Sequence, residues 1–173
     1  MKTINDVCFK GKFPKAFPCY DAVGTSANAW FQTFGFIEVG GVTMHAQEGN
    51  PKPRMFRDNR SRSLINRMGF NNDGSDAVAQ RIRKDLARRG RLDCPLFVNL
   101  GKSKITPNED ALVDYATSME RLHDVVDGYV VNVSSPNTPN LRELQHETAL
   151  ESLITGLAVR LRELNERVEV ARP

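Results

Sequence analysis

A run of amide and hydroxyl side chains follows a short apolar stretch in the second half of the chain. The apolar stretch is residues 129–131, Tyr-Val-Val, and the polar run, residues 132–142, reads Asn-Val-Ser-Ser-Pro-Asn-Thr-Pro-Asn-Leu-Arg. Amides and hydroxyls both donate and accept hydrogen bonds, so this composition suits the binding of a polar ligand. In α/β proteins, ligands and catalytic groups collect where buried parallel strands end. Residues 132–142 are therefore the first place where we expect chemistry.

Ordinary turn formation is the alternative explanation for part of this run. Ser135, Pro136 and Asn137 all favour turns for local backbone reasons, and taken alone they more often form a simple turn. Three further asparagines have two interpretations, as residues of a site or as loop, cap and strand-end residues: Asn66, Asn72 and Asn99. Matching motifs elsewhere in the chain decide between these interpretations.

Short apolar runs alternate with longer segments of helical spacing. Runs at residues 36–40, 95–100 and 129–133 contain many β-branched or aromatic residues and predict buried parallel strands. The predicted helices cover residues 26–34, 75–89, 108–124 and 147–167. In the third helix an apolar residue recurs every three or four positions: Leu112, Tyr115, Ala116, Met119 and Leu122. This alternation predicts right-handed βαβ units around a parallel sheet.

The connection between residues 41 and 72 interrupts this alternation. It is rich in Pro, Gly, Asn and Arg, and a connection of this length inside a compact domain is usually functional or disordered. Basic residues gather at 54–62 and 81–91, where we expect solvated loop and helix faces. Lys102 and Lys104 are likewise expected on a solvated loop.

The composition limits the classes of function. The chain has 173 residues and a net charge of +3, with no apolar stretch near the roughly 20 residues of a membrane-spanning helix. An odd number of widely separated cysteines, at positions 8, 19 and 94, disfavours disulfides and structural zinc and predicts a cytoplasmic protein. The histidines at 45, 123 and 146 lack metal-ligand spacing and are expected on the surface or in packing. Neither basic stretch supplies a basic face with several interleaved aromatic residues or a recognisable nucleic-acid-binding module, so we expect no nucleic-acid partner.

Four blocks of the sequence, in order, resemble the class 2 dihydroorotate dehydrogenases, the quinone-reducing flavoenzymes of pyrimidine synthesis. Residues 36–40 with 49–54 resemble the second barrel strand and the loop after it, and residues 65–72 resemble the substrate loop. Residues 98–102 resemble the third strand, and residues 132–141 resemble the fourth strand with the catalytic loop. The resemblance implies an α/β fold of the (β/α)8 TIM-barrel type.

The resemblance also implies a catalytic set. Serine rather than cysteine as the catalytic base marks the quinone-dependent class, and the matching position is Ser135. A hydroxyl is a weak base, so it needs a hydrogen-bonded relay and exclusion of water. The family's relay corresponds to Thr138 and Phe70.

The same resemblance implies binding residues for dihydroorotate or orotate and for FMN. The matching substrate-binding positions are Asn66, Arg67, Met68, Gly69, Asn132 and Asn137. The matching positions for FMN are Gly40, Asn99 and Asn132. Quinone is the implied final electron acceptor.

Several positions depart from the family pattern. Residues 16–24 stand where the family has a small-residue first strand, and Ala22 replaces a lysine that serves the active site. Gly41 stands in place of a serine or threonine, which removes a hydroxyl from the flavin site. Asn140 replaces a glycine, and asparagine tolerates left-handed backbone better than most residues.

The length predicts a partial barrel. A (β/α)8 barrel takes about 250 residues, so residues 1–173 are expected to form one partial flavoenzyme domain of about the first four strand–helix units. Two functions remain open: a dihydroorotate dehydrogenase that is incomplete alone, or a non-catalytic remnant acting as a structural or interaction subunit. Both predict a complementary half-barrel or a homo-oligomer as partner. Contact with a membrane is expected only at its periphery, through missing or partner segments.

Overall fold

A three-stranded parallel sheet forms the centre of the molecule. The computed structural model of the chain describes residues 36–90, 95–136 and 138–167. Strands β1 (Ile37–Val42), β4 (Leu96–Gly101) and β5 (Gly128–Asn132) pair in the order β1-β4-β5, with β4 in the middle. The three predicted strands are confirmed within one or two residues. The predicted helix 26–34 and the altered strand at 16–24, including Ala22, lie outside the described residues.

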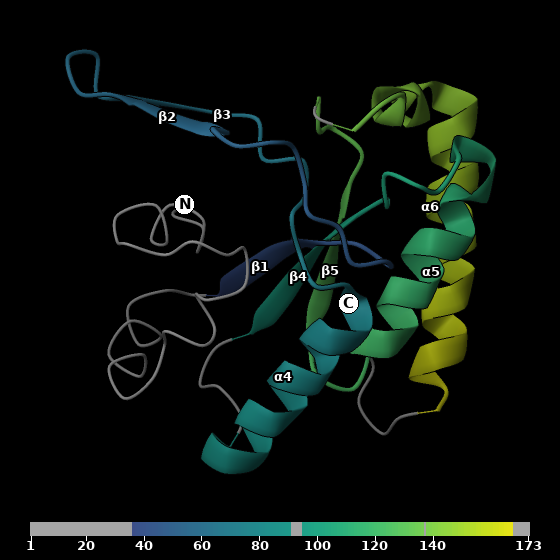
Figure 1. Cartoon of the computed structure of the whole chain (residues 1–173). Helices are drawn as coiled ribbons and strands as arrows, with labels where there is room; N and C mark the ends of the chain where they lie inside the picture. Colours follow the sequence, from purple (N-terminus) through teal and green to yellow (C-terminus); the bar gives the residue numbers. More distant parts are fainter. Residues whose placement is uncertain (1–35, 91–94, 137, 168–173) are drawn as a thin grey trace.

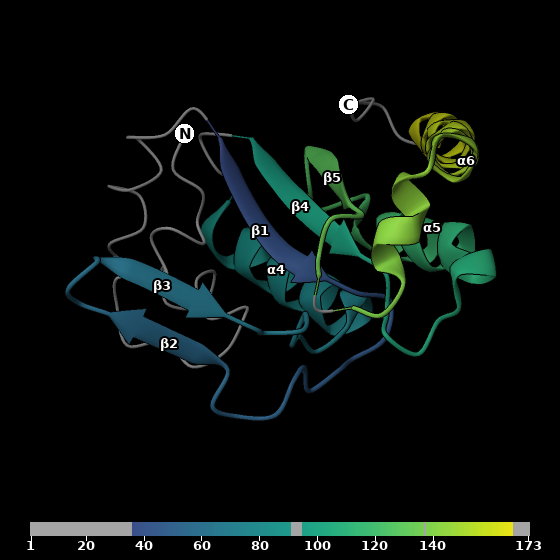
Figure 2. The ribbon, with the colours of Figure 1, turned by 90° about the horizontal axis from the view of Figure 1, so that it is seen from above.

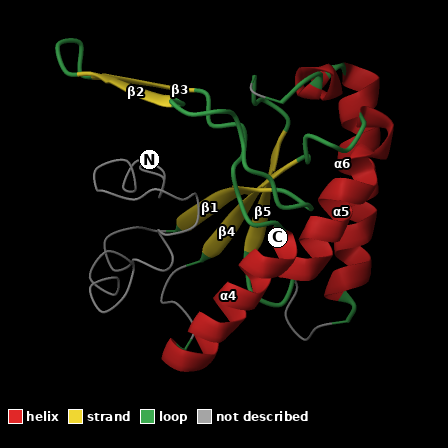
Figure 3. Cartoon of the chain, viewed as in Figure 1, coloured by secondary structure: helices red, strands yellow, loops and turns green. Residues whose placement is uncertain are grey.

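Helices cover one face of the sheet, as in an α/β protein (Figures 1 and 3). They are α4 (Ser75–Arg89), α5 (Ala111–Leu122) and α6 (Glu147–Asn165), with 3-10 turns η1 (Asn108–Asp110) and η2 (Leu141–Gln145) ahead of α5 and α6. The core lies between the helices and the sheet. The strand side chains in it are fully or almost fully buried: Ile37, Val39, Val42, Leu96, Val98 and Leu100.

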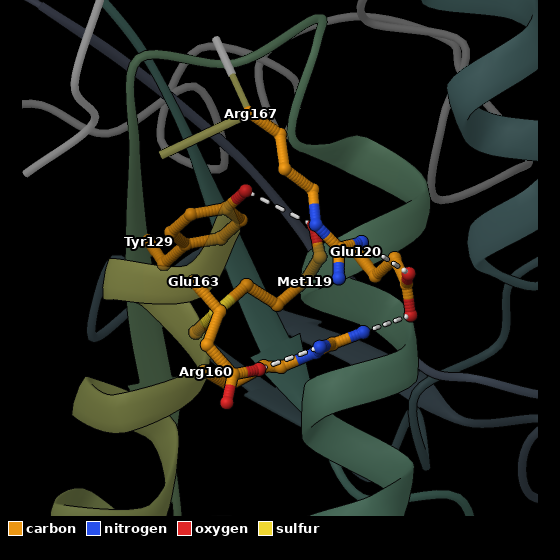
Figure 4. A network of polar contacts seen from close by, with 6 residues as sticks. All are labelled: Met119, Glu120, Tyr129, Arg160, Glu163 and Arg167. Atoms are coloured by element: carbon orange, nitrogen blue, oxygen red, sulfur yellow. Dashed lines mark hydrogen bonds and ion pairs between the residues drawn. The ribbon is translucent and has the colours of Figure 1, made fainter. Parts of the chain in front are cut away.

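Polar contacts fasten the helical layer to itself and to the sheet. Figure 4 shows Arg160 of α6 between Glu120 of α5, at 2.9 Å, and Glu163, at 2.7 Å. The side-chain hydrogen bonds to these two carboxylates raise the pKa of Arg160 above its ordinary value. Helix α5 is also bonded to the sheet: the Tyr129 hydroxyl of β5 donates to the Met119 carbonyl of α5 at 3.0 Å (Figure 4). Helices α4 and α5 are joined by two further hydrogen bonds. Arg83 of α4 donates to the Arg121 carbonyl of α5 at 2.7 Å, and the Arg121 guanidinium donates to the Ser75 Oγ of α4 at 3.1 Å.

An antiparallel hairpin occupies the middle of the long connection 41–72. Strands β2 (Met55–Asp58) and β3 (Ser63–Asn66) pair from Met55 with Asn66 to Asp58 with Ser63, and every residue of both strands is exposed. The hairpin projects away from the sheet and helices (Figure 2). No strand was predicted for these residues, because apolar residues that nothing in the described chain buries produce no alternating pattern.

Candidate functional site

The carboxyl ends of β1, β4 and β5 lie at one edge of the sheet (Figure 2). On the face away from the helices, the parallel register places Glu38 beside Phe97, Gly40 beside Asn99, and Gly101 beside Asn132. Strand periodicity sends all of these side chains to the same face. The structure therefore brings Asn99 and Asn132, both predicted from the resemblance, onto one surface.

A continuous row of hydrogen bonds crosses this face. The Asn99 Nδ2 donates to the Glu38 Oε1 at 2.9 Å, and the Asn132 Nδ2 donates to the Asn99 Oδ1 at 3.1 Å. At the far end, the Asn132 Oδ1 accepts from the Ser134 backbone N and from its Oγ, both at 3.0 Å. We call these four residues, Glu38, Asn99, Asn132 and Ser134, the amide row. Glu38 was not predicted as a site residue, because its contact with Asn99 depends on the pairing of β1 with β4, which no local sequence pattern encodes.

Several contacts anchor the loop that carries the predicted base. The Tyr115 hydroxyl of α5 donates to the Asn132 carbonyl at 2.8 Å, and burial raises the pKa of this phenol. Beyond the strand, Gln145 Nε2 donates to the Val133 carbonyl at 3.0 Å and Arg142 Nε to the Ser134 carbonyl at 3.2 Å. The backbone on either side of the amide row is thus tied to α5 and η2.

The predicted catalytic and binding residues of this loop lie next to the amide row in sequence and differ in exposure. Ser135 is half-buried, while Thr138 is buried and its carbonyl accepts from the Leu141 N at 3.3 Å. Asn137 lies outside the described residues. Asn140 adopts a left-handed backbone with φ of 57°, so it occupies the conformation for which the family uses glycine.

The predicted substrate loop, residues 65–72, begins with the last two residues of β3 and leads back to the sheet. Arg67 donates from Nε and Nη2 to the Pro53 carbonyl at 3.1 and 2.9 Å, which turns its guanidinium toward its own hairpin. Met68 is half-buried, and its carbonyl accepts from the Asn50 N at 3.0 Å. The Asn66 side chain is exposed at the end of β3. Gly69 has a φ of 74°, and an added Cβ would lie 2.9 Å from the Asn50 N.

The Phe70 ring lies over two glycines at the sheet edge. A Cβ added to Gly41 would lie 2.5 Å from the ring, and one added to Gly101 would lie 2.8 Å from it. Gly41 is the position where the family pattern has a hydroxyl, so the aromatic ring fills the space that this side chain would take. Next to it, Gly40 packs directly against the β4 backbone. A Cβ added at this position would lie 2.4 Å from the Asn99 carbonyl oxygen.

The Asn72 side chain holds the loop backbone in place, as expected if this residue is a loop or cap residue and not part of the site. Its Oδ1 accepts from the Gly74 N at 2.9 Å and from the Thr43 N at 3.2 Å. Its Nδ2 donates to the Phe70 carbonyl at 2.7 Å and to the Thr43 Oγ1 at 2.8 Å. Three of these four hydrogen bonds go to backbone groups and the fourth goes to the Thr43 hydroxyl.

Lys102 corrects one expectation from the sequence. The side chain is only 2% exposed instead of solvated, and its Nζ donates to the carbonyls of Ser103 and Thr106. Burial lowers the pKa of Lys102, and the charges of Asp114 and Glu109 partly offset this effect. The reason is that the turn after β4 folds back on itself and encloses the ammonium group, which a sequence pattern does not reveal. Lys104 is exposed as expected.

The donor set of the open face suits a flavin or a pyrimidine. Asn99 and Asn132 present amide groups, which pair with the alternating carbonyl and N–H groups of such rings. The described residues include no group of three or more His, Cys, Asp or Glu side chains arranged to hold a metal ion. Within the same residues, no helix is both long and apolar enough to cross a membrane.

Comparison with known proteins gives the same assignment as the motifs. The model of the family "Dihydroorotate dehydrogenase" matches residues 2–168. This chain belongs to the dihydroorotate dehydrogenase family. It is similar to the dihydroorotate dehydrogenase (quinone) of Gloeobacter violaceus, with 52% identity over 83% of this chain and 40% of the relative. The corresponding protein of Natronomonas pharaonis is 49% identical over 88% of this chain and 41% of the relative.

A solved structure confirms the fold. The dihydroorotate dehydrogenase of Eimeria tenella in complex with ferulenol superposes with a TM-score of 0.69 and 43% identity, covering 78% of this chain and 36% of that chain. The α/β architecture therefore corresponds to the N-terminal part of the dihydroorotate dehydrogenase barrel, as predicted, and the resemblance to the quinone class is confirmed. The chain spans about 40% of the length of the curated relatives it matches.

Proposed function

We propose that this chain supplies the N-terminal strands, the substrate loop and the catalytic loop of a quinone-dependent dihydroorotate dehydrogenase. The observation that carries the proposal is the amide row, which lies at the carboxyl edge of the sheet directly before Ser135. A complementary half-barrel, or a second copy of the chain, supplies the remaining units. The protein acts in the cytoplasm, with any membrane contact made through its partner segments.

The proposed roles follow from side-chain chemistry. Asn66, Asn132 and Asn137 pair with the amide edge of dihydroorotate, and residues 67–69 shape the loop that covers it. Ser135 takes a proton from a ring carbon and passes it on through a relay that includes Thr138, with Phe70 excluding water. Bound FMN would supply the hydride acceptor beside the neighbouring ring carbon, and quinone would be the final electron acceptor. Gly40, Asn99 and Asn132 hold the flavin.

Absorbance spectroscopy of the purified chain tests this proposal. The chain is incubated with FMN, desalted, and mixed anaerobically with dihydroorotate, alone and in the presence of a separately expressed C-terminal half of a relative. Retained flavin colour that bleaches on addition of substrate supports the proposal. A Ser135→Ala variant is the matched control, and it should retain the colour without bleaching. A preparation that stays colourless even with the added half contradicts the assignment of an FMN site.

A second function, as an interaction subunit without catalysis, is favoured by a different observation. Strands β1 and β5 each pair on one side within the described sheet, so both edges present unpaired backbone groups. The hairpin adds large exposed apolar side chains, Met55, Phe56, Leu64 and Ile65. Binding of the C-terminal half without flavin retention would support this second function over the first.

A further inference from the structure

Glu38 is the carboxylate at one end of the amide row. It lies in β1, 61 residues from Asn99 in sequence, and accepts from the Asn99 Nδ2 at 2.9 Å on the partly buried open face. None of the roles assigned above uses it. A half-buried carboxylate that is aimed at a predicted ligand-binding amide needs its own explanation.

The chemistry of the row gives it a direction. A carboxamide has a donor end and an acceptor end and can turn over, whereas an ionised carboxylate only accepts. Glu38 therefore requires Asn99 to present its NH2 group to β1 and its oxygen to β5. That oxygen in turn requires the NH2 group of Asn132, whose own oxygen then faces the N–H and hydroxyl of Ser134. The carboxylate at one end of the row and the Ser134 backbone N–H at the other end, which can only donate, therefore require the same orientation of both amides.

We propose that Glu38 is a positioning residue that orients the Asn99 amide directly and, together with the Ser134 N–H, holds the Asn132 amide in its orientation for ligand binding. Each NH2 group has two hydrogens and uses one of them within the row among the described residues. The remaining hydrogen of each amide is a donor, so the row recognises a planar ligand that presents carbonyl or ring-nitrogen acceptors along one edge. This inference rests on the proposed function, in which the ligand is the flavin or the pyrimidine.

Nuclear magnetic resonance of the 173-residue chain tests the orientation of the two amides without any ligand. The side-chain NH2 signals of Asn99 and Asn132 are assigned by their loss in Asn99→Asp and Asn132→Asp. Glu38→Gln keeps the size of the side chain but can donate as well as accept, and Glu38→Ala removes the acceptor. The matched control is Glu109→Gln, at an exposed carboxylate outside the row.

The expected result is a change that travels along the row. Both Glu38 variants should shift or double the signals of Asn99 and of Asn132, which does not contact Glu38, while Glu109→Gln changes neither. In a fluorescence titration with FMN, Glu38→Ala should bind about tenfold more weakly, which corresponds to the loss of one well-placed hydrogen bond. Unchanged Asn132 signals in both Glu38 variants would overturn the inference.

The two readouts separate this inference from the proposed function. If the Asn132 signals move as expected but the unmodified chain binds no FMN even with the C-terminal half, the orienting role stands and the FMN assignment fails. If the unmodified chain binds FMN and both Glu38 variants bind it equally well, Glu38 has no positioning role and the FMN assignment stands.

Discussion

The parallel sheet and the β2–β3 hairpin are both built from short strands, but they are stabilised in opposite ways. Sheet side chains such as Val42, Val98 and Leu100 have no exposed surface, because α4 and α5 cover them. In the hairpin, all eight strand residues are exposed, and Ile65 keeps 66% of its surface. The sheet therefore holds the amide row with contacts inside this chain. The hairpin, which leads into the substrate loop, exposes its apolar side chains, and no other part of the described structure covers them.

The largest test of this contrast is truncation of one apolar side chain in each region. Leu100→Ala should lower the free energy of unfolding by about 2–5 kcal/mol, because it opens a cavity in the middle strand. Ile65→Ala, the matched control in the hairpin, should change it by less than about 0.5 kcal/mol. Urea unfolding followed by circular dichroism measures both. An equal loss in the two variants would mean that the hairpin is covered in solution, for example by a second copy.

Asn72 gives the next largest expected effect, at the junction between the two regions. Asn72→Ala should cost about 2–3 kcal/mol, because its four hydrogen bonds hold the end of the substrate loop to the segment after β1. Asn66→Ala is the comparison, since Asn66 is exposed and should leave stability unchanged while weakening substrate binding. Urea unfolding of both variants separates a structural asparagine from a proposed ligand-binding one. A loss at Asn66 as large as at Asn72 would contradict this separation.

Gly41 tests how tightly the substrate loop is closed onto the sheet. Gly41→Ser restores the hydroxyl of the family pattern, but its Cβ would lie 2.5 Å from the Phe70 ring. We expect a loss of about 1–3 kcal/mol from overpacking. In the Phe70→Ala background the same serine should cost at least about 0.5 kcal/mol less, because the ring has been removed. Additive effects in this double-mutant cycle would show that the ring does not lie over Gly41 in solution.

The sequence predicted the sheet and missed the hairpin for the same physical reason. Burial on one face imposes a period, and the helix at 75–89 was predicted with the bounds that the structure has. Residues 55–66 have no buried face in the described chain, so their strand pairing left no pattern to read. The signal in that region was the family motif, which identified residues as site candidates without indicating a hairpin.

The motifs predicted candidate site residues, but no local pattern predicted the contacts between residues that are far apart in sequence. Asn99 and Asn132 were identified from motifs, and the register of β4 and β5 brings them within hydrogen-bond distance. The bond from Asn99 to Glu38 depends on the pairing of β1 with β4, which no local pattern encodes. Lys102 was misread for a different reason, because the carbonyls that accept from its ammonium group, those of Ser103 and Thr106, belong to the turn that directly follows it.

The smallest expected effect concerns the helical layer behind the sheet. Arg83 of α4 donates to both carboxylate oxygens of Asp124, at 2.6 and 2.7 Å, and to the Arg121 carbonyl at 2.7 Å. The hydrogen bonds from Arg83 lower the pKa of Asp124 below its ordinary value of 3.8. Because the folded-state pKa is the lower one, this contribution to stability is complete above the unfolded pKa and is lost as the pH falls through the folded pKa.

Arg83→Met should therefore lower the free energy of unfolding by about 0.5–1 kcal/mol at pH 7, since both side chains are partly exposed. The difference from the unmodified chain should shrink as the pH falls below about 4. Arg88→Met is the matched control, because its exposed guanidinium pairs with Asp85 within a single turn of α4, and its removal should cost less. Urea unfolding between pH 3 and pH 7 measures all three proteins. A difference that stays constant over this range would mean that Arg83 acts through its aliphatic packing and its bond to the Arg121 carbonyl, and not through the charge of Asp124.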